Sequence, residues 1–336
     1  MSRAEERAQF LEAAGWPNAR IAPLAGDASA RRYARIAGRE GRTAMLMDAA
    51  PEHGMDLAPF IAITLWLREQ GFSAPEILHA DPARGLLLIE DFGRGLYADL
   101  CTAQPGMETE LYEAAVDLLA ALQTMEPPAR LAPYDADILL EEAGRLILWY
   151  LPAASGTEPG ADMAAEYRAL LLAALGPVAE ATGCVVLRDY HAQNLFWLPE
   201  RSGLARVGLI DYQDALRGHP AYDLVSLLED ARRDTGAGLH KAMMARHLAA
   251  TGLEPEAFRQ ALAALGAQRN LKIVGLFCRL WLRDGKPHYL DLIPRVWWHL
   301  QRDLAAPGMA DLARWVARHV PPPEPSVLDR IRGQRA

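Results

Sequence analysis

Val185-Val186-Leu187-Arg188-Asp189-Tyr190-His191-Ala192-Gln193-Asn194-Leu195 is the stretch that decides the fold. Its apolar run delivers Asp189 into a polar loop, and Asn194 follows five positions later. A second apolar run, residues 207–210, then presents Asp211. Metal-assisted phosphoryl transfer uses these residue types in this order, because one carboxylate orients the attacking hydroxyl while an amide oxygen and a second carboxylate hold Mg²⁺. The spacing predicts Asp189 as the catalytic residue and Asn194 and Asp211 as metal ligands.

The segment resembles the catalytic region of the aminoglycoside phosphotransferase and choline kinase family of protein-kinase-like enzymes. Their loop reads His-Gly-Asp-x-x-x-x-Asn, whereas Arg188 and Asp189 stand here without the preceding His. The downstream run Pro220-Ala221-Tyr222-Asp223-Leu224 is also similar. We expect Asp223 either to brace the catalytic loop or to stabilise the first turn of its own helix. The alternative for the whole set is a chance Asp in a strand–turn–strand unit.

The resemblance implies an α+β, two-lobe, protein-kinase-like fold. Residues 1–93 would form a small β-rich N-lobe that binds ATP. Residues 94–336 would form a large, mainly helical C-lobe with the catalytic loop and the substrate site. Mg²⁺ would act as the second cofactor.

Composition limits the possible partners and compartments. The chain has 336 residues, 51% of them hydrophobic, and a net charge of −8, which argues against nucleic acid as a partner. Its three cysteines show neither metal-ligand spacing nor a disulfide framework. The N-terminus is charged, and no apolar run approaches the ~20 residues of a membrane span. We therefore expect a soluble cytoplasmic protein with no membrane partner, and the oligomeric state stays open.

Residues 21–36 read as two strands joined by a small-residue turn at residues 26–30. Such a turn can let backbone N–H groups approach phosphate, and the resemblance places it over the nucleotide. Ser29, Arg31 and Arg32 are the candidate phosphate contacts. The alternative is a simple hairpin.

The strand at residues 43–48 contains no Lys, although kinase-like enzymes use one here to neutralise the α- and β-phosphates. In the helix predicted at residues 57–70, Phe60 stands where the partner Glu would lie. The joint absence of the Lys and its partner Glu is reasonable, because one buried charge without its partner would be costly. Arg31, Arg32 and Arg35 are the nearest substitutes.

Glu90-Asp91-Phe92-Gly93 follows the buried strand at residues 86–89. Its Asp-Phe-Gly is not the metal motif, because a metal ligand has to follow the catalytic loop and this one precedes it. Its place indicates the hinge between the lobes, where the backbone of Glu90, Asp91 and Phe92 would hydrogen-bond the adenine edge. The Asp91 side chain would serve as a cap or turn residue.

From residue 96 the pattern is mainly helical, and the segment at residues 279–289 is rich in cationic and aromatic residues. Trp281 is suited to stacking on a sugar face, and Arg279 and Arg283 are suited to pairing with a carboxylate. The alternative is that the Trp side chain packs the core of the C-lobe.

A finer resemblance is to bacterial N-acetylmuramate/N-acetylglucosamine kinases. It is carried by Gly26-Asp27-Ala28-Ser29, Arg31-Arg32-Tyr33, Met47-Asp48-Ala49, the catalytic loop and Leu282-Arg283-Asp284-Gly285-Lys286-Pro287. It implies ATP-dependent phosphorylation of the anomeric hydroxyl of an amino sugar in cell-wall (peptidoglycan) recycling. Two alternatives remain: a kinase for an aminoglycoside or choline type of substrate, and a catalytically inactive nucleotide-binding regulator.

Overall fold

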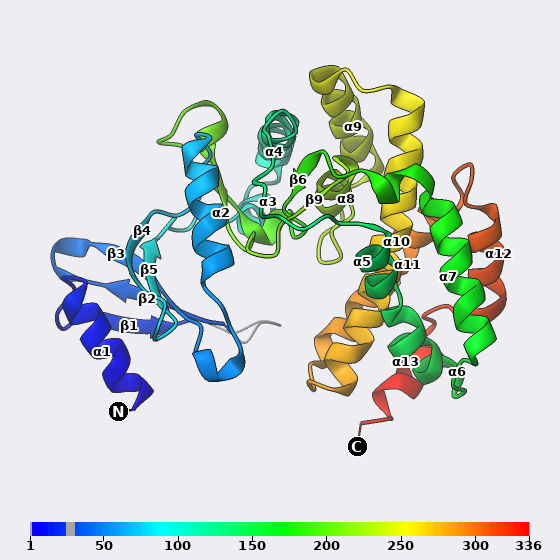
Figure 1. Cartoon of the computed structure of the whole chain (residues 1–336), viewed down its shortest axis with the longest axis horizontal. Coiled ribbons are helices and arrows are strands. Elements are labelled where there is room, and N and C mark those ends of the chain that lie inside the picture. Colours follow the sequence, from blue (N-terminus) through cyan, green and yellow to red (C-terminus); the bar gives the residue numbers. More distant parts are fainter. Residues whose placement is uncertain (1, 25–30, 336) are drawn as a thin grey trace. The chain divides into compact units, whose positions relative to one another are not determined.

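The computed structural model describes residues 2–24 and 31–335, which divide into two compact units (Figure 1). The first unit comprises Met1–Ala114 and Ala192–Asp214, and the second comprises Ala115–His191 and Ala215–Ala336. The elements of the first unit are α1 (Arg3–Ala13), β1 (Arg20–Pro23), β2 (Arg32–Ala37), β3 (Thr43–Asp48), α2 (Ala58–Glu69), β4 (Ile77–Asp81), β5 (Leu86–Glu90), α3 (Tyr97–Ala103), β7 (Leu195–Trp197) and β8 (Val207–Leu209). Helix α4 (Glu108–Leu122) runs across the boundary between the units.

The second unit is mainly helical, as expected for an α+β chain of this type. Its elements are α5 (Ala136–Ala143), a π-helical turn (Leu146–Tyr150), α6 (Leu151–Ser155), α7 (Ala161–Leu175), β6 (Cys184–Val186), β9 (Leu216–Gly218), α8 (Ala221–Leu228), α9 (Ala237–Thr251), α10 (Pro255–Leu282), α11 (Ile293–Leu304), α12 (Ala310–His319) and α13 (Pro325–Arg332). Short 3₁₀ turns connect several of these helices and strands. None of the helices in the described part of the chain has both the length and the apolar composition needed to cross a membrane.

The sheet of the first unit has the strand order β1-β2-β3-β5-β4, and all neighbouring strands are antiparallel. Ala34 of β2 lies opposite Leu46 of β3, and the next pair along is Arg35 opposite Met45. Because side chains alternate along a strand, these two pairs point to opposite faces of the sheet.

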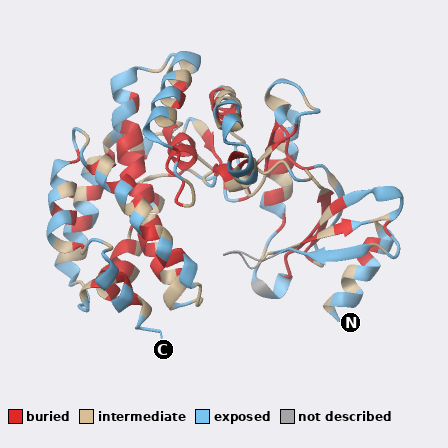
Figure 2. Ribbon diagram, turned by 180° about the vertical axis from the view of Figure 1, so that it is seen from behind, coloured by how far each residue is buried: buried red, intermediate tan, exposed pale blue. Residues whose placement is uncertain are grey.

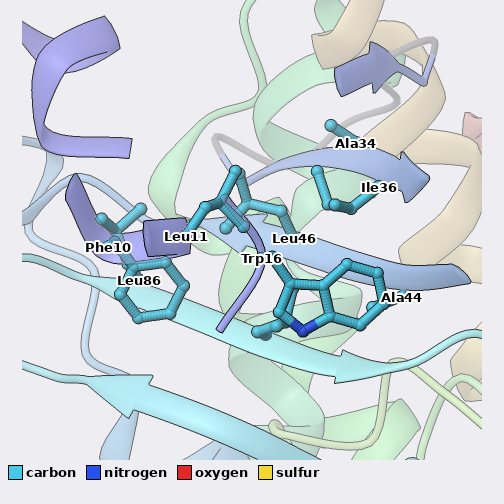
Figure 3. Packing of buried hydrophobic residues seen from close by; sticks show 9 residues of the cluster. Phe10, Leu11, Trp16, Ala34, Ile36, Ala44, Leu46 and Leu86 are labelled. Atoms are coloured by element: carbon cyan, nitrogen blue, oxygen red, sulfur yellow. The ribbon is translucent and has the colours of Figure 1, made fainter. Parts of the chain in front are cut away.

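One face of this sheet packs against α1 and the residues that follow it (Figure 3). The Trp16 indole lies so close to Gly38 that a Cβ at that glycine would stand 2.8 Å from the ring, so a side chain there would displace the indole. The buried cluster consists of Phe10, Leu11, Trp16, Ala34, Ile36, Ala44, Leu46, Leu86 and Leu88. The side chains on the other face of these strands do not belong to this buried cluster.

The β7–β8 hairpin belongs to the first unit, although it follows the catalytic loop in sequence. Leu209 N–H donates to the Ser73 carbonyl at 2.8 Å, and Trp197 N–H donates to the Gly95 carbonyl at 2.6 Å. These backbone hydrogen bonds explain why the returning segment Ala192–Asp214 belongs to the first unit.

Helix α10 forms the centre of the second unit, where it packs against α5, α8, α11 and the π-helical turn. Most of its residues are buried, as the colouring in Figure 2 shows. At Gly275 a Cβ would lie 2.2 Å from the carbonyl carbon of Arg145. Only glycine permits so close an approach of the two backbones, and this contact fixes α10 beside the start of the π-helical turn.

Candidate functional site

A cavity of about 280 Å³ lies in the first unit, on the face of the sheet that turns away from α1. It contains the predicted hinge and both predicted metal ligands. The lining residues are Leu24, Arg31, Tyr33, Arg35, Met45, Phe60, Pro75, Ile89, Glu90, Asp91, Phe92, Asn194, Phe196, Ile210 and Asp211. Most of them are apolar, which suits a planar base, and the few polar groups can fix a polar substituent.

Asn194 and Asp211 are brought together by the β7–β8 hairpin. Asn194 immediately precedes β7, Asp211 follows β8 by one residue, and the Ile210 N–H donates to the Asn194 carbonyl at 3.1 Å. The Asn194 amide nitrogen lies 3.5 Å from an Asp211 carboxylate oxygen. Gln213 donates to the other oxygen of this carboxylate at 2.9 Å. An amide and a carboxylate at this spacing offer the oxygen ligands that Mg²⁺ prefers.

The hinge residues make several contacts of their own. Glu90 N–H donates to the Glu76 carbonyl at 2.8 Å, so this N–H does not face the adenine edge as we expected. The Asp91 carboxylate accepts from Gly93 N–H at 3.0 Å, as expected of a turn residue. The Phe92 ring lies 5.7 Å from the Phe196 ring and lines the cavity with it.

Aromatic contacts stand where the Lys–Glu ion pair of kinase-like enzymes would lie. Met47 of β3 is fully buried, and Phe60 of α2 stacks on Tyr212 with ring centroids 5.4 Å apart. The Tyr212 hydroxyl lies 2.7 Å from the Thr64 hydroxyl, also on α2. Helix α2 is thus fixed to the residue beside Asp211 by stacking and a neutral hydrogen bond, which explains how the charged pair can be absent.

The three candidate arginines, Arg31 just before β2 and Arg32 and Arg35 within it, differ in direction. Arg31 and Arg35 line the cavity, whereas Arg32 shares the sheet face of Ala34 that packs toward α1. Strand alternation turns Arg32 away from the cavity, and its role as a phosphate contact stays a prediction. Arg35 pairs with Asp91 at 2.8 Å and donates to the Gly93 carbonyl at 2.9 Å, which ties it to the hinge. Ser29 lies outside the described residues.

Tyr33 lines the cavity together with Arg31 and Asp211, one of the two predicted metal ligands. Burial and the negative charge of Asp211 raise the pKa of the Tyr33 phenol, and the positive charge of Arg31 opposes this rise. The phenol thus stays protonated at neutral pH, with Arg31 and Asp211 both near enough to influence it. Arg31 and Asp211 both line the cavity with Tyr33, whereas Arg35, four residues further along the chain, is paired with Asp91 of the hinge segment.

The catalytic loop belongs to the second unit and follows β6. The Asp223 carboxylate, in the first turn of α8, accepts from Leu187 N–H at 2.6 Å and from Arg188 N–H at 2.8 Å. Burial raises the pKa of Asp223 to about 7, against the effect of these two N–H donors, and the charge of Asp189 adds to the rise. Of the two roles expected for Asp223, these bonds support the brace of the catalytic loop.

Sequence analysis missed Glu142, a buried carboxylate on α5 that pairs with Arg188 and lies 2.8 Å from Lys272. The sequence nevertheless contains an indication that Glu142 is paired. Glu142 lies three residues after Leu139 and so shares the apolar face of an amphipathic helix, where a charged side chain needs a partner.

The residues predicted to bind substrate lie near the end of α10. Trp281 donates its indole N–H to the Ile331 carbonyl at 3.0 Å, so its polar edge is engaged by α13 in the manner of a packing residue. Arg283 is paired with its neighbour Asp284 through two hydrogen bonds. Burial lowers the pKa of Arg279, and the nearby charges of Arg283 and Arg145 lower it further. The Arg279 Nε is also a buried donor with no hydrogen-bond partner among the described residues, which an added carboxylate could satisfy.

Comparison with known proteins identifies the group to which these features are similar. Residues 20–262 match the model of the phosphotransferase enzyme family. A Caulobacter vibrioides protein named N-acetylmuramate/N-acetylglucosamine kinase is 38% identical, covering 95% of this chain and 97% of that protein. A Pseudomonas aeruginosa protein of the same name is 34% identical, covering 92% of both chains.

Solved structures agree on the fold. An ADP-bound aminoglycoside phosphotransferase, APH(2'')-Ib, superposes with a TM-score of 0.59 at 14% identity, covering 89% of this chain and 97% of that one. The expected protein-kinase-like fold is thereby confirmed.

Proposed function

Because this chain belongs to the phosphotransferase enzyme family, we propose that it is an ATP-dependent kinase for N-acetylmuramate and N-acetylglucosamine. The phosphate acceptor is the anomeric hydroxyl, and the product enters cell-wall sugar recycling. The observation that carries this proposal is a cavity that contains the hinge together with Asn194 and Asp211, in a chain similar along most of its length to kinases named for these sugars. We place the reaction in the cytoplasm, where ATP is available and the three cysteines stay reduced.

The residues of the cavity fit the nucleotide and its metal. Its apolar side chains, Met45 and Ile89 among them, suit the faces of adenine, and the backbone of the hinge suits its edge. Asn194 and Asp211 would hold Mg²⁺ through oxygen atoms, because Mg²⁺ is bound by one or two protein ligands together with phosphates. When bound, ATP supplies the phosphoryl group and Mg²⁺ neutralises its developing charge.

Asp189 is the proposed catalytic residue. Its carboxylate accepts a hydrogen bond from the anomeric hydroxyl and finally takes its proton. Because the transition state of phosphoryl transfer is loose, the main contribution of Asp189 is to orient the sugar oxygen. Asp223 keeps the loop in place by accepting two backbone N–H groups next to Asp189.

Arg31 is the proposed substitute for the absent lysine. Of the two arginines that line the cavity, Arg35 is paired with Asp91 at the hinge, whereas Arg31 lies four residues earlier in the chain and shares the lining with Asp211. A cation in the cavity that holds the proposed metal ligands is suited to neutralising the phosphates. The guanidinium can bind two phosphate oxygens at once, as a lysine cannot. Arg279 is the proposed partner of the lactyl carboxylate of N-acetylmuramate.

Turnover of ATP with Mg²⁺ against a panel of acceptors tests the function. We expect turnover with N-acetylmuramate and N-acetylglucosamine, and none above the no-acceptor blank with choline or kanamycin. Turnover with choline or kanamycin alone would be consistent with the fold but would exclude an amino sugar as the substrate. Tight ATP binding without turnover of any acceptor would point to an inactive regulator.

A further inference from the structure

The catalytic loop contains an unusual backbone conformation directly before Asp189. Arg188 has a φ of 73°, in the left-handed region that non-glycine residues rarely adopt. Such a conformation costs on the order of 1 kcal/mol or more and persists only where the surroundings hold it. Asp223 holds the backbone of this residue through its N–H. The surroundings must also hold the long, charged Arg188 side chain, which starts one residue away from the catalytic carboxylate.

Glu142 of α5 holds that side chain. The Arg188 guanidinium donates to one oxygen of the Glu142 carboxylate and lies over the Tyr134 ring, with 5.4 Å from its central carbon to the ring centroid. The other carboxylate oxygen accepts from Lys272 of α10 at 2.8 Å and from the Tyr134 hydroxyl. Glu142 is only 4% exposed. One buried carboxylate thereby joins the catalytic loop to α5 and α10.

The charge of Glu142 is firmly maintained. Burial alone would raise its pKa, but Lys272 and Arg188 outweigh burial and lower it to about 2. Asp189 is among the charges that act on the Arg188 guanidinium, after the stronger influence of Glu142. Two carboxylates therefore act on the same guanidinium, and the Glu142 carboxylate accepts a hydrogen bond from it.

We infer that Glu142 is a positioning residue that keeps Arg188 away from Asp189, so that the Asp189 carboxylate stays available to the acceptor hydroxyl. Without the charge of Glu142, the guanidinium loses the carboxylate that holds it, and Asp189, the next residue along the chain, is one of the remaining anions that act on it. An ion pair between these neighbours would turn the carboxylate away from the substrate and reduce its ability to accept a proton. This inference rests on the proposed role of Asp189 in the kinase reaction and adds a residue that does not touch the substrate.

The test is a pair of variants assayed with the sugar that the wild-type protein turns over. We expect Glu142→Gln to lower kcat about 30-fold with little change in KM for ATP, because Arg188 is not among the residues that line the cavity. In Glu142→Gln/Arg188→Gln both charges are gone, and we expect kcat to return to within about fivefold of the wild-type value. Recovery on removing a second residue is not the behaviour of a residue that only stabilises the fold.

Lys272→Met is the matched control, because it removes a partner of Glu142 but leaves the Glu142–Arg188 pair. We expect it to lower the melting temperature and leave kcat near the wild-type value. An unchanged kcat in Glu142→Gln, or a double variant as slow as the single one, would overturn the inference. If the wild-type protein itself turns over no sugar, the proposed function fails, and that result is separate from either outcome.

Discussion

Asp189→Asn lowers kcat for the sugar about 10³-fold and leaves KM for ATP within about twofold. The asparagine keeps the size of the side chain and can still contact a hydroxyl, but it cannot take the proton. The nucleotide cavity lies in the first unit and the Asp189 loop in the second, so the substitution leaves every lining residue of that cavity in place. Steady-state kinetics with both substrates varied measures the two effects separately.

The matched control is Asp137→Asn, which changes an exposed carboxylate of the same unit. We expect it to behave as the wild-type protein. If the Asp189→Asn variant retains a third or more of the wild-type kcat, Asp189 is not the residue that accepts the proton of the acceptor hydroxyl.

Arg31→Ala lowers kcat/KM for ATP about 10²-fold, because the α- and β-phosphates lose their neutralising cation. The binding of adenosine, which carries no phosphate, stays within about twofold of the wild-type value. Titration calorimetry with ADP and with adenosine distinguishes a phosphate contact from a general loss of the cavity. Arg32→Ala is the matched control, since this neighbouring arginine points to the opposite face of the sheet.

Moving the cation provides a second test of the same role. Met47 lies opposite Tyr33, which lines the cavity, and belongs to the strand in which kinase-like enzymes carry a lysine. We expect Arg31→Ala/Met47→Lys to recover about tenfold of the lost kcat/KM, provided that thermal unfolding shows an intact fold. Equal losses in Arg31→Ala and Arg32→Ala, or equal losses of ADP and adenosine affinity, would contradict the assignment.

The order of residues along the chain predicted several local features of the structure. The helix expected at residues 57–70 is α2, Asp91 occupies a turn, and Asn194 and Asp211 meet because a short hairpin joins them. These features depend on local periodicity and on pairing between neighbouring strands, which a sequence expresses directly.

Features that depend on direction or on distant partners were not predictable in the same way. Arg31 and Arg32 are adjacent and chemically identical, and only the strand register decides which of them lines the cavity. Glu142 and Arg188 are 46 residues apart in the sequence. The charged residue on the apolar face of α5 therefore indicated that it has a partner, but the sequence did not identify which residue that is. Trp281 is a residue type suited to stacking on a sugar, yet its indole N–H donates to the Ile331 carbonyl of the C-terminal helix.

The position of the new phosphate on the sugar tests the central claim most directly. We would react the protein with ATP, Mg²⁺ and N-acetylglucosamine, examine the product by phosphorus NMR, and offer the methyl glycoside of the same sugar in parallel. Phosphorylation of the anomeric hydroxyl predicts a phosphorus signal coupled to the anomeric proton and no product from the methyl glycoside, whose anomeric oxygen is blocked. A phosphorylated methyl glycoside, or a phosphorus signal coupled to protons of another ring position, would contradict the account.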